Sequence, residues 1–320
     1  ALEGLRAKGM AVIFISHKLD EVLRVADDVT VVRAGETVAE VKSKDVTARQ
    51  LAELMVGSEL PQPTTHGDTR RSEVTLELKD VSIPTATGSR DLISHISFNL
   101  HAGEVVGIAG VEGNGQAELV EAIMGLRNYT GSIDFQGSSI DHMSVAHRHD
   151  LGIGLIPEDR QRQALMMDSP LWENRILGHQ RGKPVMRGFI LDRKATIEDT
   201  KRIMEEFDVR APGPMTAAAA LSGGNQQKFI VGREMSKAPA LLVASHPTRG
   251  VDVGAQGAIW EVLREARTKG MAIVLISADL EELIGMSDRL LVMLRGVITA
   301  ELDPQKTTPE QLGSAMTGAA

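Results

Sequence analysis

A short apolar run followed by a glycine-rich loop and a helical pattern limits the possible folds of this 320-residue chain most strongly. The run "VVGIA" at residues 105–109 is typical of a buried parallel strand, and the loop Gly110–Gln116 follows it directly. Leu119, Ile123 and Leu126 then lie on one stripe of a helix. A strand, a glycine loop and a helix in this order form the context of a phosphate-binding loop. The order also predicts an α/β fold with a mainly parallel sheet.

The loop departs from the phosphate-binding pattern G-x-x-x-x-G-K-[ST] at the two positions that carry its chemistry. Gly110 and Gly115 occupy the glycine positions, but Gln116 stands in place of Lys and Ala117 in place of Ser or Thr. The pattern therefore predicts a degenerate loop that keeps its backbone shape and lacks the cation and the magnesium-binding hydroxyl. The candidate loop residues are Gly110, Val111, Glu112, Gly113, Asn114, Gly115, Gln116 and Ala117.

Two segments of the chain are near copies of each other, residues 5–22 ("LRAKGMAVIFISHKLDEV") and 266–283 ("ARTKGMAIVLISADLEEL"). Gly9 corresponds to Gly270, and the same register continues as far as Gly318. A repeat of such long period indicates a duplicated domain of about 250 residues rather than a solenoid.

The repeat divides the chain into three predicted parts. Residues 1–57 are expected to be the C-terminal remnant of a first copy, and residues 74–320 a complete second copy, with a mostly helical subdomain with loops at about 145–235. Residues 58–73 are rich in Pro, Thr, Gly and charge, which indicates a linker. The run "MAVIFIS" at 10–16 reads as a parallel strand without sheet neighbours in this chain. The chain opens within a helical pattern without an N-cap, which predicts truncation or processing.

The segment "LSGGNQQK" has the features of a capped helix start. Ser222 is a favourable N-cap, and Gly223 and Gly224 leave their amides open to an anion at the positive end of the helix. The alternative is a capped surface helix without a ligand. The candidate residues are Leu221, Ser222, Gly223, Gly224, Asn225 and Gln226.

With the glycine loop, the capped helix and "LLVASHPTRGVDVGA" at 241–255 in this order, the chain resembles the ATP-binding cassette (ABC) family. The resemblance implies an α/β P-loop NTPase cassette with a mainly parallel sheet core, an antiparallel β subdomain and a helical signature subdomain. Its motif sequences are similar to those of the two-cassette subunits of simple-sugar importers of the ribose and galactose class. The segment "GVEGNGQ" is similar to their nucleoside-importing branch.

Against the family's pattern, several positions of the second copy are altered. Ser245 and His246 stand where the family has the Asp that holds Mg²⁺ and the Glu that polarises the attacking water. Ala278 occupies the switch-histidine position, and Glu158 the glutamine-loop position. His246 is a conceivable substitute base, but we do not expect it to act as one because the magnesium ligand and the Lys are also missing.

The intact motifs belong to the other nucleotide of a cassette pair. In such pairs each nucleotide lies between the P-loop of one cassette and the signature helix of the other. The resemblance therefore assigns the signature at 221–228 and the switch histidine of the first copy, His17, to the partner site. Asp252 matches the aspartate of the family's D-loop. His17 is the catalytic candidate, and the second copy's own nucleotide site is expected to be catalytically inactive.

The resemblance implies an ATP-binding, energy-coupling subunit of an importer for simple sugars or nucleosides. Its full form is expected to bind ATP and Mg²⁺ and to lie peripherally on the cytoplasmic face of the bacterial plasma membrane. The expected partners are membrane permease subunits, a first cassette of the same or a partner chain and, indirectly, a solute-binding protein. The parent protein is expected to be an ATPase, and this chain alone to be inactive. The alternatives are a non-catalytic regulatory or structural module, and a cassette acting on ribosomes or DNA.

Composition excludes several other classes. A net charge of −8 and an aromatic content of 3% argue against nucleic acid as a partner. The chain has no cysteine, so it offers neither a disulfide nor a thiolate metal site. His142, His147 and His149 do not have a convincing metal-ligand spacing, so no metal site is predicted. The resemblance to the ABC family implies that residues 158–160 ("EDR") contact the membrane subunit, and the alternative is a surface ion-pair cluster.

Overall fold

The computed structural model describes residues 4–5, 9–16, 19–33, 35–57, 69–85 and 91–319. Contacts between residues divide the chain into two compact units, one of residues 1–62 with 251–258 and one of residues 63–250 with 259–320. Most of the linker predicted at 58–73 and the candidate His17 lie outside the described residues, so the predicted three-part division stays a prediction.

The first unit contains a β-hairpin covered by short helices. Its elements are α2 (Leu19–Val25), β1 (Asp28–Arg33), β2 (Glu36–Lys42), η1 (Ser43–Asp45) and α3 (Ala48–Val56). Val22, Val31 and Leu51 form its small buried cluster. Thr47 and Gln50 close a reciprocal capping box at the start of α3, which satisfies backbone donors there.

The strand expected at residues 10–16 does not form. These residues have no regular secondary structure, and Ile13 and Ile15 are 97% and 100% exposed. A parallel strand needs hydrogen-bonding neighbours and cover on its faces, and an apolar sequence alone supplies neither. The lack of sheet neighbours that the sequence indicates for this run explains why no strand forms there.

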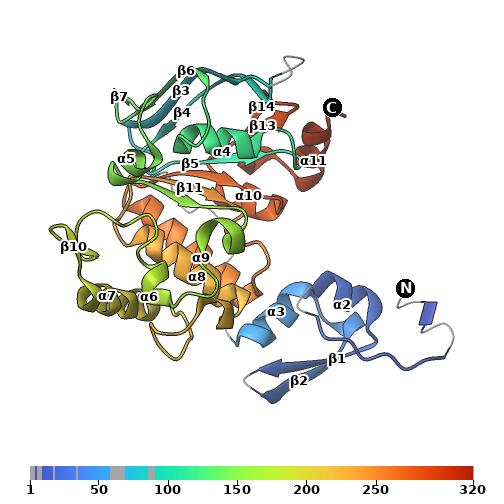
Figure 1. Ribbon diagram of the computed structural model, residues 1–320. Helices are drawn as coiled ribbons and strands as arrows, with labels where there is room; N and C mark the ends of the chain where they lie inside the picture. Colours follow the sequence, from blue (N-terminus) through green and yellow to red (C-terminus); the bar gives the residue numbers. More distant parts are fainter. Residues whose placement is uncertain are drawn as a thin grey trace. The chain divides into compact units, whose positions relative to one another are not determined.

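A six-stranded mixed sheet forms the centre of the second unit (Figure 1). Its spatial order is β14-β13-β5-β12-β11-β8. The strands are β5 (Val105–Ala109), β8 (Ile153–Ile156), β11 (Leu241–Ser245), β12 (Ala272–Ile276), β13 (Arg289–Leu294) and β14 (Val297–Leu302). All neighbours pair in parallel except β13 and β14. The mainly parallel core predicted from the alternation of strands and helices is confirmed.

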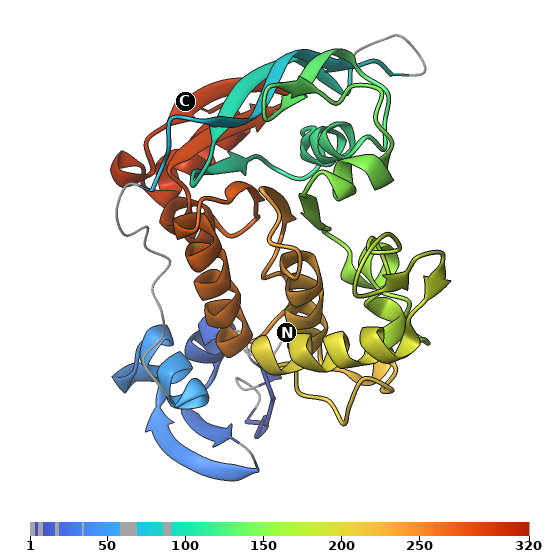
Figure 2. The ribbon, with the colours of Figure 1, turned by 90° about the vertical axis from the view of Figure 1, so that its left-hand side faces the viewer.

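A second, antiparallel sheet has the order β4-β3-β6-β7. Its strands are β3 (Val74–Ile83), β4 (Ile93–His101), β6 (Thr130–Phe135) and β7 (Ser138–Ser139). Figure 2 shows this layer at the end of the second unit opposite helix α7 (Arg193–Glu206, yellow). The predicted antiparallel subdomain is therefore present.

The remaining helices of this unit cover the sheet or form the helical region. They are α4 (Gln116–Met124), α5 (Val145–Asp150), η2 (Arg160–Ala164), α6 (Leu171–Asn174), η3 (Ala218–Ala220), α8 (Gly223–Met235), α9 (Val253–Thr268, which begins in the first unit's segment), α10 (Leu280–Met286), η4 (Pro304–Lys306) and α11 (Pro309–Thr317). The range 145–235 is not helical throughout. It contains β8 of the central sheet and a small hairpin of β9 (Met186–Arg187) and β10 (Ile190–Leu191), because strands of two to four residues carry too little periodicity to be recognised.

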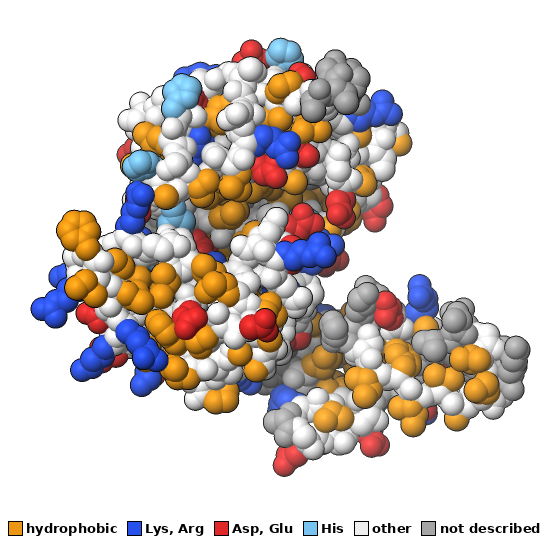
Figure 3. All heavy atoms as spheres, in the orientation of Figure 1, with side chains coloured by type: hydrophobic (Ala, Val, Ile, Leu, Met, Phe, Trp, Pro, Cys, Tyr) orange, Lys and Arg blue, Asp and Glu red, His pale blue; other side chains and the backbone are white. Residues whose placement is uncertain are grey.

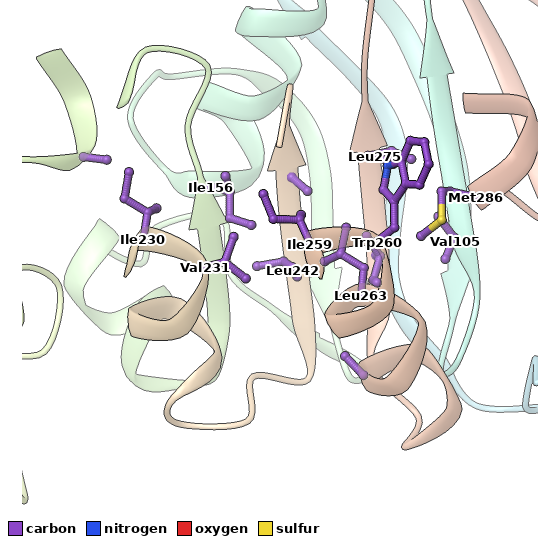
Figure 4. Packing of buried hydrophobic residues seen from close by; sticks show 14 of the residues in the cluster. Val105, Ile156, Ile230, Val231, Leu242, Ile259, Trp260, Leu263, Leu275 and Met286 are labelled. Atoms are coloured by element: carbon purple, nitrogen blue, oxygen red, sulfur yellow. The ribbon is translucent and has the colours of Figure 1, made fainter. Parts of the chain in front are cut away.

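Alternate residues of the central strands face two separate apolar clusters. Leu242 and Leu275 face α8 and the part of α9 from Ile259 onward, and Figure 4 shows this packing in close-up. Val243 and Val274 face α4 and the antiparallel sheet. Because neighbouring side chains of a strand point to opposite faces, a sheet covered on both sides needs uninterrupted apolar strands. This burial fixes the carboxyl ends of β5, β12, β11 and β8 along one edge.

Candidate functional site

The glycine loop joins β5 to α4 as the sequence predicts. β5 ends at Ala109, and α4 begins at Gln116 after Gly115, whose φ of 108° lies in the left-handed region. A Cβ atom on Gly115 would lie 2.7 Å from the Cγ2 atom of Ile93. Glycine at this position is therefore required both by backbone conformation and by packing.

The side chain of Gln116 turns back into this loop. It is 8% exposed, and its Nε2 atom donates a hydrogen bond of 3.3 Å to the carbonyl of Val111. A Cβ atom on Gly110 would lie only 2.2 Å from the same Nε2 atom. A neutral amide thus occupies the inside of the loop, and its hydrogen bond goes to the chain itself.

The loop is also held from outside by the turn between β13 and β14. The side-chain Oδ1 atom of Asn114 accepts a hydrogen bond of 2.6 Å from the amide of Arg295. The backbone carbonyl of Asn114 accepts one of 2.9 Å from the amide of Gly296. The Nδ2 atom of Asn114 donates to the carbonyl of Val111 at 2.9 Å. These bonds stabilise the shape of the loop without any ligand.

Two of the altered positions contact each other at the ends of β11 and β12. His246 follows Ser245 with a φ of 50°, and its amide donates to the carbonyl of Ile276 at 2.7 Å. The amide of Ala278 donates to the Nδ1 atom of His246 at 3.2 Å, so the neutral ring carries its proton on Nε2. Burial lowers the pKa of His246, with Arg249 acting in the same direction and Glu158 opposing it. The ring is therefore a neutral structural acceptor.

Glu158 lies at the same edge, on the loop after β8. Its Oε1 atom accepts a hydrogen bond from the Nη1 atom of Arg249. Since β5, β12, β11 and β8 are parallel neighbours, the glycine loop, Ala278, His246 and Glu158 all follow the carboxyl ends of adjacent strands. This edge is where open α/β sheets place their ligand sites.

The predicted capped helix is present as α8. The Oγ atom of Ser222 accepts the amide hydrogen of Asn225 at 3.4 Å, which satisfies one of the free donors of the first turn. Gln226 is 3% exposed, and its Nε2 atom donates to the carbonyls of Ala218 and Leu221 at 3.1 and 3.3 Å. The local structure of the predicted motif is confirmed, and its role with a nucleotide stays a prediction.

Arg160 links this helix start to the loop that follows β11. Its Nε atom donates to the Oε1 atom of Gln226 at 3.3 Å, and its Nη1 atom donates to the carbonyl of Arg249 at 2.7 Å. A Cβ atom on Gly223 would lie 2.7 Å from the Nη2 atom of Arg160. The sequence indicated a subunit contact or a surface ion-pair cluster for residues 158–160, and it did not predict this bridge. The stretch "EDR" was the only signal, and it does not reveal the partners of the arginine.

The remaining candidates are Asp252 and His17. The Oδ1 atom of Asp252 accepts the amide hydrogen of Ala255 at 2.9 Å, so the carboxylate caps the start of α9. Asp252 belongs to the segment grouped with the first unit. His17 lies outside the described residues.

Comparisons with known proteins define the class of this chain. Residues 93–249 match the family model described as ABC transporter, a span that contains the glycine loop and the capped helix. The fold is similar to the ADP conformation of MJ1267, an ATP-binding cassette of an ABC transporter, with a TM-score of 0.62 at 22% identity over 77% of this chain and 96% of that one. The chain therefore contains an ABC transporter ATP-binding domain.

Curated relatives are similar over nearly the whole chain. The nucleoside import ATP-binding protein NupA of Lactococcus lactis subsp. cremoris is 40% identical over 318 residues, which are 99% of this chain and 63% of NupA. The ribose import ATP-binding protein RbsA of Lacticaseibacillus paracasei is 36% identical over 321 residues, 98% of this chain and 61% of RbsA. The chain thus spans about three fifths of the length of these relatives. Among its described residues, no helix combines the length and the apolar character needed to span a bilayer.

Proposed function

We propose that this chain belongs to a two-cassette ATP-binding subunit that couples ATP hydrolysis to the import of nucleosides or simple sugars. One observation carries the proposal. The altered glycine loop, Ser245, His246 and Ala278 gather at one sheet edge, whereas the signature helix keeps its cap and its glycines. The names of NupA and RbsA, both import ATP-binding proteins, support the class of solute.

The residues at this edge do not fit Mg²⁺ and ATP in the manner of an active cassette. Gln116 fills the loop with a neutral amide, and Ala117 has no hydroxyl for a metal ion. Neither Ser245 nor His246 offers a carboxylate. A charge-assisted hydrogen bond is worth about 1.5–3 kcal/mol. At about 1.4 kcal/mol per factor of ten, the missing Lys contact alone lowers nucleotide affinity about ten- to a hundredfold.

In the proposed function, residues 221–226 serve a nucleotide held by another cassette. The N-terminal end of α8 presents backbone amides and the positive end of the helix dipole, which suits a phosphate group. Arg160 supports this role by joining Gln226 to the loop that follows β11. His17 would act as the switch histidine of that active site, and Asp252 as its D-loop aspartate. ATP and Mg²⁺ are accordingly the ligands of the partner site.

The proposed partners are permease subunits, a first cassette of the same or a partner chain and, indirectly, a solute-binding protein. The proposed location is peripheral, on the cytoplasmic face of the bacterial plasma membrane. Exposed apolar side chains on the helical region support a protein contact there, as the orange side chains over this part of the second unit illustrate (Figure 3). Met166, Phe189, Ile190 and Met215 are 40%, 103%, 75% and 58% exposed.

An ATPase assay tests the proposal. The chain alone is expected to hydrolyse no ATP above background, and addition of the separately produced N-terminal cassette of the same protein is expected to give steady turnover. Ser222→Arg should reduce that turnover on the order of a hundredfold, because the bulky side chain removes the cap of α8 and obstructs the helix start whose backbone amides would face the phosphate. Ser144→Arg is the matched control, since Ser144 also caps a helix, α5, but outside the signature.

Two results would contradict the proposal. Steady hydrolysis by the chain alone would mean that the altered edge is itself catalytic. Tight binding of the two cassettes without any turnover would favour the regulatory or structural module instead.

A further inference from the structure

Three ligand-type side chains from distant parts of the sequence meet beside β8, away from the nucleotide edge. His149 lies near the end of α5, His179 in the loop after α6, and Glu234 near the end of α8. One ligand atom from each residue lies within 4.8 Å of the others. The Nε2 atom of His149 is 3.3 Å from the Oε2 atom of Glu234. The two imidazole rings stand perpendicular, with centroids 4.8 Å apart.

The histidines of this cluster have polar atoms without partners. His179 is 1% exposed, and neither of its ring nitrogens has a hydrogen-bond partner among the described residues. The Nδ1 atom of His149 is likewise buried without one. An unsatisfied buried polar group costs about 1–3 kcal/mol. A metal ion bound by one ring nitrogen of His179 would relieve part of this cost.

One carboxylate oxygen of Glu234 pairs with Arg233, and the other faces the histidines. Glu234 is 5% exposed. Its Oε1 atom accepts a hydrogen bond of 2.9 Å from the Nε atom of Arg233, whereas Oε2 faces His149 and receives only a weak bond of 3.4 Å from the amide of Leu155. The oxygen Oε2 can thus act as a ligand while Oε1 keeps its ion pair.

We propose that His149, His179 and Glu234 form a binding site for one divalent transition-metal ion of the zinc type. Two imidazoles and a carboxylate are a donor set that Zn²⁺ prefers, with a fourth position for water. Bonds of about 2.1 Å in a tetrahedral arrangement place ligand atoms about 3.4 Å apart. The ligand atoms of His149 and Glu234 already have this spacing, and the ring of His179 has to approach by at most about 1.4 Å to complete the set.

Gly178 leaves room for this arrangement. Its φ of 75° is left-handed, and a Cβ atom on it would lie 3.0 Å from the Nε2 atom of His149. His149 is the outermost member of the cluster, with 12% of its side chain exposed. An ion would therefore enter past His149.

Three positive groups lie near the cluster, and the two arginines among them have partners of their own. Arg175 pairs with Asp199 at 2.6 Å, and Arg233 donates to Glu234 and to the carbonyl of Ala164. Lys237 is the third nearby cation. These charges disfavour an ion held only by weak electrostatic contacts. They select an ion that forms strong bonds to imidazole nitrogen, which Mg²⁺ and Ca²⁺ do not.

Metal binding would join three separate segments of the helical region. α5, the loop after α6 and the C-terminal part of α8 meet at this point through the side chains of His149, His179 and Glu234. The same helix α8 carries the capped signature at its other end. The role of the ion is accordingly to stabilise the packing of α8 against α5 and the loop after α6. This role does not depend on nucleotide.

Metal content and spectroscopy test the site. The whole chain, freed of metal with a chelator and then dialysed, is titrated with Zn²⁺ or Co²⁺ in the absence of nucleotide. We expect one tightly bound ion per chain, visible absorption of four-coordinate Co²⁺, and a melting temperature raised by several degrees at saturating Zn²⁺. His142→Gln is the matched control, because His142 is an exposed histidine of the same stretch that lies outside the cluster.

Variants of the two histidines test whether these residues bind the metal ion. His179→Gln and His149→Gln should each weaken binding at least tenfold and abolish the Co²⁺ spectrum, while His142→Gln binds like the original chain. If His179→Gln does not fold, the less buried His149→Gln provides the answer. Absence of tight binding by the original chain, or an unchanged Co²⁺ spectrum in His149→Gln, would overturn the proposal. Neither result depends on the ATPase assay.

Discussion

The side chain of Gln116 lies almost fully buried inside the loop between β5 and α4, where its amide donates to the carbonyl of Val111. A lysine in that position extends a charge toward a phosphate, whereas this glutamine bonds to the loop itself. The glycines still have the conformation that such a loop requires, as the left-handed Gly115 illustrates. The loss at this position is therefore one of charge and not of backbone shape.

We predict that Gln116→Lys raises the affinity of the chain for ATP about ten- to a hundredfold, because one charge-assisted hydrogen bond is regained. Titration with a fluorescent ATP analogue measures the change. Gln116→Ala is the control, since it removes the amide from the loop without adding charge, and it should leave binding weak. Equal affinity of Gln116→Lys and the original chain would mean that the loop no longer presents its amides to a phosphate.

Tyr129 gives a residue-scale prediction about pH. Its hydroxyl donates to Asp141 at 2.9 Å and accepts from Arg148 at 3.2 Å. Burial, aided by Asp141 and opposed by Arg148, raises the pKa of Tyr129 to about 12. An unfolded chain releases this proton near pH 10, so the stabilisation is complete below pH 10 and is lost as the pH rises through about 12.

Because Tyr129 is the chain's single tyrosine, ultraviolet absorption of tyrosinate reports its titration directly. The native chain should titrate near pH 12, and the chain in urea near pH 10. Coincident titrations of the native and urea-treated chain would refute the partly buried, hydrogen-bonded state of the ring.

At the scale of elements, the sequence correctly predicted the helices, strands and loops that are determined by residues close to one another in the chain. The strand–loop–helix at 105–124 and the cap of α8 depend on neighbours a few positions apart. The strand expected at 10–16 does not form, because a parallel strand is stable only when neighbouring strands pair with it. The cluster of His149, His179 and Glu234 could not be predicted either, because only the tertiary fold brings these segments together.

The cap of α8 gives the prediction at this scale. Ser222→Ala removes the acceptor for the amide of Asn225 and should lower the free energy of unfolding of the second unit by about 1 kcal/mol. Ser222→Thr keeps a hydroxyl at the cap and should lose much less. Urea unfolding followed by tryptophan fluorescence measures both variants, since Trp172 and Trp260 lie in the second unit. Equal stability of Ser222→Ala and the original chain would show that water satisfies this helix end.

At the scale of the whole molecule, the two units differ greatly in the apolar core that supports each. The first unit has a buried cluster of Val22, Val31 and Leu51, with partly buried residues around it. The second has two extensive clusters on the opposite faces of its central sheet. Since buried apolar area is the main source of folding free energy, the first unit should be much the less stable.

We therefore predict that the chain unfolds in two transitions, with the first unit unfolding at the lower urea concentration. Circular dichroism reports helices and strands of both units, whereas both tryptophans of the chain, Trp172 and Trp260, belong to the second. Ellipticity should begin to fall at urea concentrations where tryptophan fluorescence is still native. Leu51→Ala, which leaves a cavity in the first cluster, should move only the early transition, and the matched Leu242→Ala only the late one. Superimposable curves from the two probes would instead mean that the units fold as one cooperative whole.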